Sequence, residues 1–257
     1  MRDKIKHVLK YVLPYQLILY IKQLEVIFRC WLTNNFYEPE EKIILNLLEK
    51  QPPGCVIDVG LNLGQYSLPM SKLSNVNSII AFEPQTIVAK VIKFTLKALK
   101  VKKVYVYEMF AGKEKGFVSI NLKNKDNSHR GQEVFMDLSA NDDTLKIAVN
   151  SLDNVVAERK DCSNVIFIKA DVEGAEMQVL AGTVGIIEKF KPLVMLELQD
   201  KYLARFSNSL TEVIAWMQEK GYYPFYVQGS KLIEWNNATI SNTGNYVFLP
   251  DKKMANL

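Results

Sequence analysis

The sequence predicts an α/β fold in which a seven-stranded, mainly parallel sheet has helices on both faces and an N-terminal helical arm precedes it. Short runs rich in β-branched residues recur along the chain. Helix-like stretches follow the first two runs, an alternation typical of parallel strands joined by crossover helices. The chain has 257 residues, 48% of them hydrophobic, which is enough for one large domain with a modest extension.

Residues 1–35 are predicted to form the arm, a basic amphipathic helical segment, and residues 36–257 the main domain. The arm contains six basic and two acidic residues, so it accounts for the whole net charge of +4. Because the main domain is neutral, a nucleic-acid partner is not expected. The arm is expected either to pack on the domain or a homodimer partner, or to make a peripheral contact with an anionic membrane surface or lipid-linked glycan.

The location expected for the protein is the cytoplasm, free or at the inner face of the membrane. The apolar run at residues 11–21 is about half the length that spans a bilayer, and Pro14 and Gln16 interrupt it. The three cysteines, Cys30, Cys55 and Cys162, are widely separated, which suggests neither a disulfide framework nor a zinc site.

The main domain begins with a helical pattern at residues 38–50, which ends at Pro52, Pro53 and Gly54. Two strands and a helix are predicted in the tail, where the helical spacing covers residues 210–221. Short apolar runs predict the seven strands at residues 56–60, 78–84, 103–110, 164–174, 192–198, 222–228 and 245–250. The last two are expected to form an antiparallel pair.

Residues 112–160 break the alternation of strands and helices. A strand-like run, FVSINL, leads into the polar stretch KNKDNSHRGQE and then into IAVNSLDNVVAE. We expect an inserted segment that faces the substrate.

A glycine-containing turn follows the first strand, which predicts a nucleotide site. Gly60 and Gly64 lie between the strand VIDVG and the next helix, where glycine allows positive φ and close approach of a ligand. Asn62 lies between them, and asparagine tolerates the left-handed region. Gln65 occupies the third glycine position of the dinucleotide motif, which argues against NAD.

Two acidic residues favour a cationic nucleotide ligand. Asp58, within the first strand, would repel a pyrophosphate but suits a sulfonium that carries an α-ammonium group. Glu83 ends the second strand, a position from which a carboxylate accepts hydrogen bonds from the two hydroxyls of an adenosine ribose. Residues 108–111, which end the third strand and include Met109, Phe110 and Ala111, are placed where adenine would lie.

A second acidic turn ends the fourth strand, in KADVEGAEMQVLAG. Lys169, Asp171, Glu173 and Glu176 fall within eight residues at the edge of the sheet where ligands bind. Three carboxylates at one turn repel one another, and the helix dipole offsets only about 0.3 to 1 kcal/mol for each. Such a cost is typical of a functional site.

These motifs, in this order, resemble the FkbM family of methyltransferases. VIDVGLNLGQYSL, IIAFEP, SLDNV, KADVEGAEMQVLAG and KPLVMLEL carry the resemblance, which covers about residues 36–200. Leu61 and Ala170 stand where the family usually has alanine and isoleucine. The resemblance implies a Rossmann-like class I methyltransferase fold, S-adenosylmethionine as the cofactor, and O-methylation of a sugar or another hydroxyl. The cofactor-binding residues predicted in this way are Asp58, Gly60, Asn62, Gly64, Tyr66, Glu83, Pro84, Phe110, Ala111 and Asp171.

For catalysis, Asp171 or Glu173 is predicted to take the proton of the acceptor hydroxyl, and Lys169 to steady the cluster. His129, in the polar stretch, is the alternative base. No metal is predicted, because the acidic residues lack the spacing of a calcium loop.

A cell-envelope polysaccharide or its lipid-linked precursor is the preferred acceptor. The alternatives are a nicotinamide-dependent oxidoreductase and a catalytically idle protein that binds S-adenosylmethionine.

Overall fold

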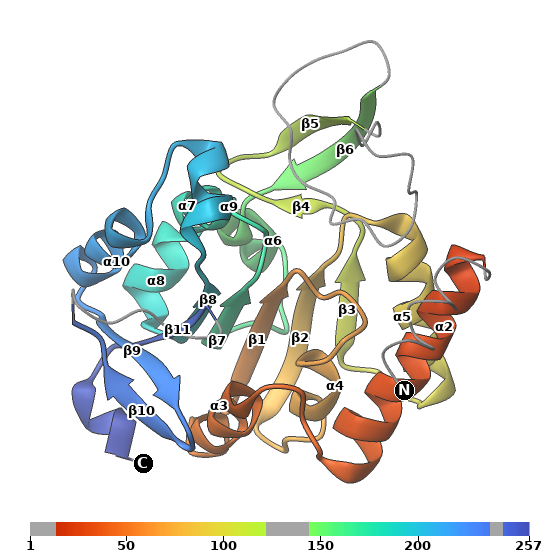
Figure 1. Ribbon diagram of the computed structural model, residues 1–257, viewed down its shortest axis with the longest axis horizontal. Coiled ribbons are helices and arrows are strands. Elements are labelled where there is room, and N and C mark those ends of the chain that lie inside the picture. The colour runs from red at the N-terminus through yellow and green to blue at the C-terminus, as the bar shows by residue number, and fades with distance from the viewer. Residues whose placement is uncertain (1–13, 122–143, 237–243, 257) are drawn as a thin grey trace.

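The structure is a computed structural model that describes residues 14–121, 144–236 and 244–256. An eight-stranded sheet lies at its centre, in the order β10-β9-β11-β8-β7-β1-β2-β3 (Figure 1). The five strands from β8 to β3 are parallel to one another, whereas β11 is antiparallel to both β8 and β9. The strands are β1 (Gly54–Val59), β2 (Val76–Phe82), β3 (Val104–Tyr107), β7 (Val165–Ala170), β8 (Leu193–Glu197), β9 (Tyr223–Gln228), β10 (Lys231–Glu234) and β11 (Asn245–Leu249).

Each of the seven predicted strands contributes residues to this sheet, and the predicted count of seven is one strand too low. The additional strand, β10, pairs antiparallel with β9, and Gln228 lies opposite Lys231. Only Gly229 and Ser230 connect the two strands, and Gly229 has a φ of 63°. A two-residue connection that contains glycine is a hairpin signal, but the four-residue strand after it is too short to show a clear alternation.

Helices cover both faces of the sheet, as predicted. Side chains at successive strand positions, such as Val56 and Ile57, belong to different core clusters because successive residues of a strand point to opposite faces. One face packs against α6 (Leu152–Ala157), α7 (Glu176–Ala181), α8 (Val184–Phe190) and α10 (Leu210–Glu219). The other face packs against α2 (Tyr15–Val26), α3 (Pro39–Glu49), α4 (Ser67–Met70) and α5 (Thr86–Ala98).

The described part of the arm packs on the main domain. It consists of α2 and a π-helix, η1 (Ile27–Thr33). Leu19 and Val26 are buried against the loop residues Leu61 and Leu63 and against α5, and the Gln23 side chain donates a hydrogen bond to the carbonyl of Leu63 at 3.1 Å. The arm therefore contacts the turn that follows β1. No helix within the described ranges has the length and apolar character required to cross a membrane.

A second sheet stands beyond the carboxyl ends of the parallel strands (Figure 1). Its strands are β4 (Phe110–Ala111), β5 (Gly116–Asn121) and β6 (Thr144–Asn150), in the order β4-β6-β5. The strand predicted at residues 103–110 is therefore two strands, because the chain leaves the large sheet after Tyr107 and pairs with β6. The small sheet belongs to the segment predicted as an insertion, whose residues 122–143 lie outside the described residues.

Candidate active site

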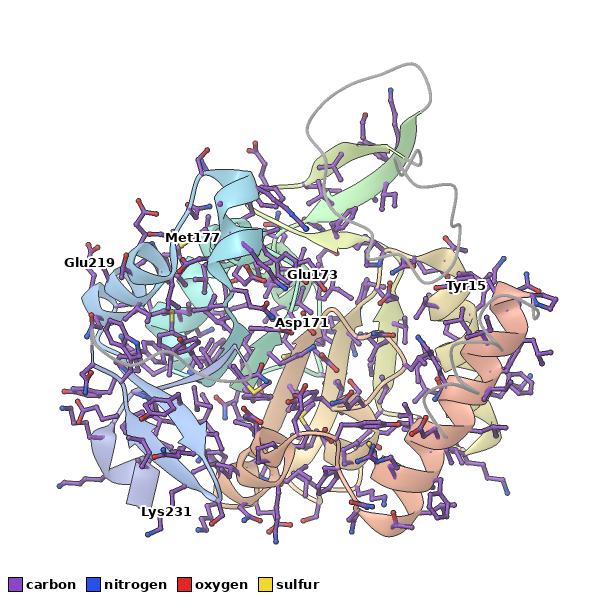
Figure 2. All side chains as sticks on the ribbon, viewed as in Figure 1. Tyr15, Asp171, Glu173, Met177, Glu219 and Lys231 are labelled. Carbon is purple, nitrogen blue, oxygen red and sulfur yellow. The ribbon has the colours of Figure 1, made fainter. Side chains whose placement is uncertain are left out.

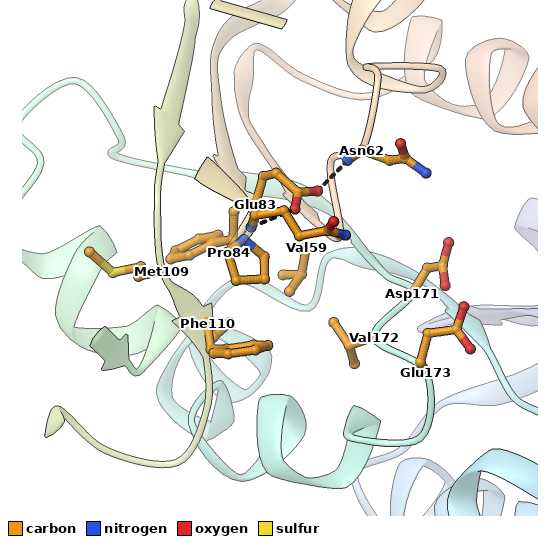
Figure 3. A pocket seen from close by; sticks show the side chains of 13 residues that line it. Val59, Asn62, Glu83, Pro84, Met109, Phe110, Asp171, Val172 and Glu173 are labelled. Carbon is orange, nitrogen blue, oxygen red and sulfur yellow. Dashed lines mark hydrogen bonds between the residues drawn. The ribbon is translucent and has the colours of Figure 1, made fainter. Parts of the chain in front are cut away.

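The ends of β1, β2, β4 and β7 surround a cleft of about 660 Å³, partly open to solvent (Figure 3). Glu83, Pro84 and Phe110 lie on one side of the cleft, and Asp171 and Glu173 lie on the other. The lining residues are Val59, Gly60, Asn62, Phe82, Glu83, Pro84, Gln85, Met109, Phe110, Ala111, Asp171, Val172 and Glu173.

The turn after β1 has the backbone conformation expected from its residues. Gly60 and Gly64 have φ values of 81° and 79°, and Asn62 between them has a φ of 49°. A Cβ atom at Gly60 would lie 2.0 Å from the carbonyl oxygen of Asp171, so only glycine fits there. The prediction that Asn62 adopts the left-handed region is confirmed.

Glu83 connects the second strand to this turn. Its carboxylate accepts hydrogen bonds from the backbone N–H of Asn62 and from that of Gln85, both at 2.9 Å. The side chain is 4% exposed. Burial raises the pKa of Glu83 to about 7, although the two N–H donors oppose the shift. The two bonds fix the carboxylate at the cleft wall, where each oxygen retains a lone pair for a hydroxyl donor.

Asp58 lies beneath the turn and does not line the cleft. One of its oxygens, Oδ2, accepts a hydrogen bond from the Ser67 hydroxyl at 2.6 Å, and Oδ1 lies 3.9 Å from the ammonium of Lys169. Burial raises the pKa of Asp58, whereas Lys169 and Ser67 lower it. In this structure the carboxylate holds Lys169 and the start of α4 in place.

Lys169 connects this buried layer to the cleft. Its ammonium donates to the carbonyl of Gly60 at 3.1 Å and to the carboxylate of Asp171 at 3.3 Å. Burial alone would lower the pKa of Lys169, but Asp171 and Asp58 outweigh it and the pKa is raised. The structure thus brings Lys169, Asp171 and Asp58 together, as the prediction of a steadied cluster requires.

The carboxylates of the second turn point in different directions. Asp171 and Glu173 reach the cleft at the carboxyl end of β7, as Figures 2 and 3 show. Glu173 has a φ of 56°, and it precedes Gly174 at 108°. Glu176 instead points into the turn, where it accepts hydrogen bonds from the N–H groups of Val172 and Gly174. Burial raises its pKa to about 7. Glu176 therefore supports the strained turn that presents Glu173.

Glu197 joins this cluster from the end of β8. Its carboxyl accepts a hydrogen bond from Gln199 at 2.6 Å. Burial, with a further contribution from the neighbouring Asp171, raises the pKa of Glu197 to about 8. The carboxyl groups of Glu197 and Asp171 lie close together because β8 pairs directly with β7 and both residues lie at the carboxyl ends of these parallel strands.

Besides Asp58 and Lys169, three further predicted residues lie away from the cleft or outside the described residues. The hydroxyl of Tyr66 donates to Glu38 at 2.8 Å, and its buried ring lies beside Lys169. Gly64 packs against Ile92 on α5. Neither of these residues lines the cleft, and His129 falls outside the described residues. Within the described ranges, no group of three histidine, cysteine or acidic side chains is arranged to hold a metal ion.

The prediction of site residues missed Val59, Phe82, Gln85 and Val172, all of which line the cleft. Each is a direct neighbour of a strand end or of a predicted residue. The shared edge of parallel strands was the signal that could have found them, since ligands bind outside the carboxyl ends of such strands.

A family model described as the methyltransferase FkbM domain matches residues 58–224. A methyltransferase FkbM from Methylobacillus flagellatus KT has a similar structure, with 16% identity over 90% of this chain and 54% of that chain and a TM-score of 0.50. This chain thus spans about half the length of that protein. No curated protein matches the sequence.

Two further structures are similar at lower TM-scores. A precorrin-6y C5,15-methyltransferase from Geobacter metallireducens GS-15 is 13% identical over 81% of this chain and 85% of that chain, with a TM-score of 0.44. A protein from Streptococcus mutans in complex with SAH is 11% identical over 83% of this chain and 97% of that chain, with a TM-score of 0.46.

Proposed function

Because this chain belongs to the FkbM methyltransferase family, we propose that it transfers a methyl group from S-adenosylmethionine to a hydroxyl of a sugar or glycan. Family membership confirms the predicted family and fold class, and it favours a methyltransferase over the oxidoreductase alternative. The single observation that carries the site assignment is the fixed Glu83 carboxylate, which the N–H of Asn62 holds at the wall of the cleft.

The residues of the cleft fit the cofactor. Glu83 offers acceptor oxygens to the two hydroxyls of a ribose, and Pro84, Phe110 and Val172 offer apolar surface to a purine ring. Asp171 and Glu173, on the opposite side, suit the cationic end of the molecule. Asp58 does not reach the cleft, so we assign it a supporting role instead of the direct contact that the sequence suggested.

S-adenosylmethionine, held by the residues of the cleft, would supply a methyl group on a sulfonium; in-line attack of the acceptor oxygen on the methyl carbon would break the carbon–sulfur bond and release the sulfur as a neutral thioether. The chain must therefore orient the acceptor hydroxyl and remove its proton. Orientation contributes about 7 to 11 kcal/mol in such reactions, and a general base contributes about 10² to 10⁴ in rate. We assign the proton to a carboxylate oxygen of Asp171, which Lys169 orients at 3.3 Å. Glu173 is the second candidate, and Glu197 lies next to Asp171, where it can share the proton.

The acceptor is proposed to bind between the second turn and the small sheet. A further hollow of about 770 Å³, partly open to solvent, lies between the small sheet and α7, the helix that follows the second turn, and Gly112, Lys113, Glu114 and Gln178 are among the residues that line it. Polar and charged groups of this kind are suited to the hydroxyls of a sugar. A cell-envelope polysaccharide or its lipid-linked precursor is the acceptor class that we prefer.

The test is to incubate the purified full chain with S-adenosylmethionine and pools of candidate glycans, and to search by mass spectrometry for a gain of one CH₂ group. Calorimetric titration with S-adenosylmethionine and with NAD is run beside it. We expect binding of S-adenosylmethionine alone and one methylated glycan. Binding without a methylated product in any pool would support the idle binding protein, and binding of NAD alone would overturn the proposal.

A further inference from the structure

Exposed apolar side chains gather on one face of the arm. Of the ten large hydrophobic residues that are exposed in the described ranges, seven lie on α2, η1 and the adjacent helix α5. We call them the apolar stripe: Leu17, Tyr20, Ile21, Leu24, Phe28, Leu32 and Phe94, which are 44 to 66% exposed. Such a concentration on a water-exposed surface is typical of an interaction site.

The stripe is a continuous face and not a set of scattered residues. Leu17, Ile21, Leu24 and Phe28 recur every three or four positions, which places them along one side of a helix. The ring of Phe94 on α5 meets that of Tyr20 edge to face, with 6.5 Å between centroids. The opposite side of α2 is already buried on the domain through Leu19, Gln23 and Val26. The exposed apolar residues are therefore not needed for packing within the described fold.

A basic band borders the stripe. Residues 86–103, which form α5 and the loop after it, contain six lysines and no acidic residue. Three of the lysines, Lys90, Lys93 and Lys97, are exposed on α5 at spacings that place them on the same side as Phe94. Of these three lysines, Lys93 forms an ion pair with Glu108 at 2.7 Å. α2 and α5 lie side by side beyond β3 (Figure 1), so the lysines flank the apolar face directly.

The sequence adds positive charge at the same end of the chain. Residues 1–13, directly before α2, contain Arg2, Lys4, Lys6 and Lys10 against Asp3 alone. Any partner of the stripe therefore meets apolar side chains and positive charge together. A bilayer with anionic headgroups offers both, because apolar side chains enter the boundary between headgroups and acyl chains while lysines attract the anionic lipids.

From this combination we propose that the apolar stripe and the lysines of α5 dock the protein on the surface of an anionic phospholipid bilayer. A second copy of the chain fits less well, because a two-fold interface would bring the lysines of α5 against the same lysines of the partner. The proposal does not rest on the proposed function, since no residue of the cleft takes part in it.

The experiment is flotation of the full chain with vesicles of phosphatidylcholine alone and of phosphatidylcholine mixed with phosphatidylglycerol. The apolar variant is Leu24→Ser with Phe28→Ser, both highly exposed positions. The charge variant is Lys90→Gln with Lys97→Gln. The control is Tyr223→Ser, because Tyr223 is 39% exposed but lies on β9, at the end of the large sheet opposite β3.

We expect the wild-type chain to float with the mixed vesicles and to bind neutral vesicles at least tenfold more weakly. The apolar variant should lose at least tenfold in binding to the mixed vesicles. The charge variant should lose the preference for anionic lipid, whereas Tyr223→Ser should behave as the wild type. Melting curves of all variants check the fold.

Two results would overturn the proposal. One is that the wild-type chain does not float with the mixed vesicles, or that the apolar variant floats with them as well as the wild type does. The other is a wild-type dimer in light scattering that the apolar variant converts to a monomer while no form binds vesicles, which would assign the stripe to a second copy. If the apolar variant fails to fold, the charge variant and the dependence on salt decide the matter.

Discussion

The carboxylate of Glu83 accepts a hydrogen bond of 2.9 Å from the backbone N–H of Asn62, which lies 21 residues earlier in the sequence. This bond joins the end of the second strand to the left-handed turn after the first. Both groups line the cleft, so a single contact fixes the two loops between which a nucleoside is proposed to bind.

Replacement of Glu83 with Gln should weaken the binding of S-adenosylmethionine. The loss of hydrogen bonds to a charged carboxylate costs about 1.5 to 3 kcal/mol, which corresponds to roughly 10- to 150-fold in affinity. Isothermal titration calorimetry measures the change. The control is Glu188→Gln, which removes an exposed carboxylate outside the cleft lining. Equal affinities for both variants and the wild type would remove Glu83 from the site.

At Gly60, the addition of one methyl group should abolish cofactor binding or destabilise the fold. The Cβ of Gly60→Ala would lie 2.0 Å from the carbonyl oxygen of Asp171. Gly229→Ala is a matched control, because it has a positive φ of 63° but nothing within 4 Å of the added atom. Both variants place alanine at a positive φ, which costs roughly 1 to 2 kcal/mol. The prediction fails if the two variants melt at the same temperature and bind S-adenosylmethionine equally.

Substitution of Lys169 by Met should reduce the free energy of unfolding by about 3 to 5 kcal/mol, because it leaves the buried Asp58 without its cation. Addition of Asp58→Asn should restore part of the loss. Urea denaturation gives both values. Lys252→Met removes a half-exposed partner of Glu234 and should cost less than about 1 kcal/mol. A double variant no more stable than Lys169→Met alone would argue against the coupling.

Turnover should distinguish the two candidate bases. Asp171→Asn should lower kcat by about 10² to 10⁴ if Asp171 removes the proton of the acceptor, and Glu173→Gln should then have the smaller effect. Single-turnover assays with S-adenosylmethionine and the unmethylated glycan that proves to be the acceptor measure this loss. The opposite order would assign the proton to Glu173, and undiminished turnover in both variants would exclude both carboxylates.

The stability of the protein should fall as the pH rises from about 4.5 to 7, in part because of Glu176. Burial raises the pKa of Glu176 from 4.5 to about 7 in the folded chain, so in this window the unfolded state releases a proton that the folded state retains. The stabilisation is complete below pH 4.5 and is lost as the pH passes 7, by up to roughly 3 kcal/mol.

The variant Glu176→Gln keeps an acceptor for the N–H groups of Val172 and Gly174 but does not titrate. Its melting temperature should therefore depend less on pH than that of the wild type. The exposed Glu188, replaced by Gln, should leave the wild-type trend unchanged. Parallel slopes for the wild type and Glu176→Gln would contradict a buried, titrating Glu176.

The large sheet could be predicted because its strands have local signatures. A parallel strand buried on both faces is a continuous run of apolar residues, and each of the seven predicted runs lies in the sheet. The strand β10 has only four residues with exposed ends, and its pairing with β9 depends on a two-residue turn. The change of sheet after Tyr107 was likewise not predictable, because it depends on the pairing of Phe110 with Val149, which lies far away in sequence.

In the candidate site, the conformations of the turns and the positions of the acids at the strand ends could be predicted from the sequence. Gly60 and Asn62 adopt the left-handed conformations that their residue types permit, and Glu83 and Asp171 follow from their positions at the carboxyl ends of parallel strands. These are local properties of the backbone and of strand direction, so a pattern of residues is sufficient to reveal them.

The tertiary structure alone decided which acids face the cleft and which are buried. Asp58 and Glu176 have the same chemistry as Asp171, but Asp58 is enclosed with Lys169 and Ser67, and Glu176 supports the turn of residues 172–174. The partners of each carboxylate come from different elements, up to 111 residues apart for Asp58 and Lys169. Desolvation and pairing depend on that assembly, and therefore the division between supporting and cleft-facing acids appears only once the chain is folded.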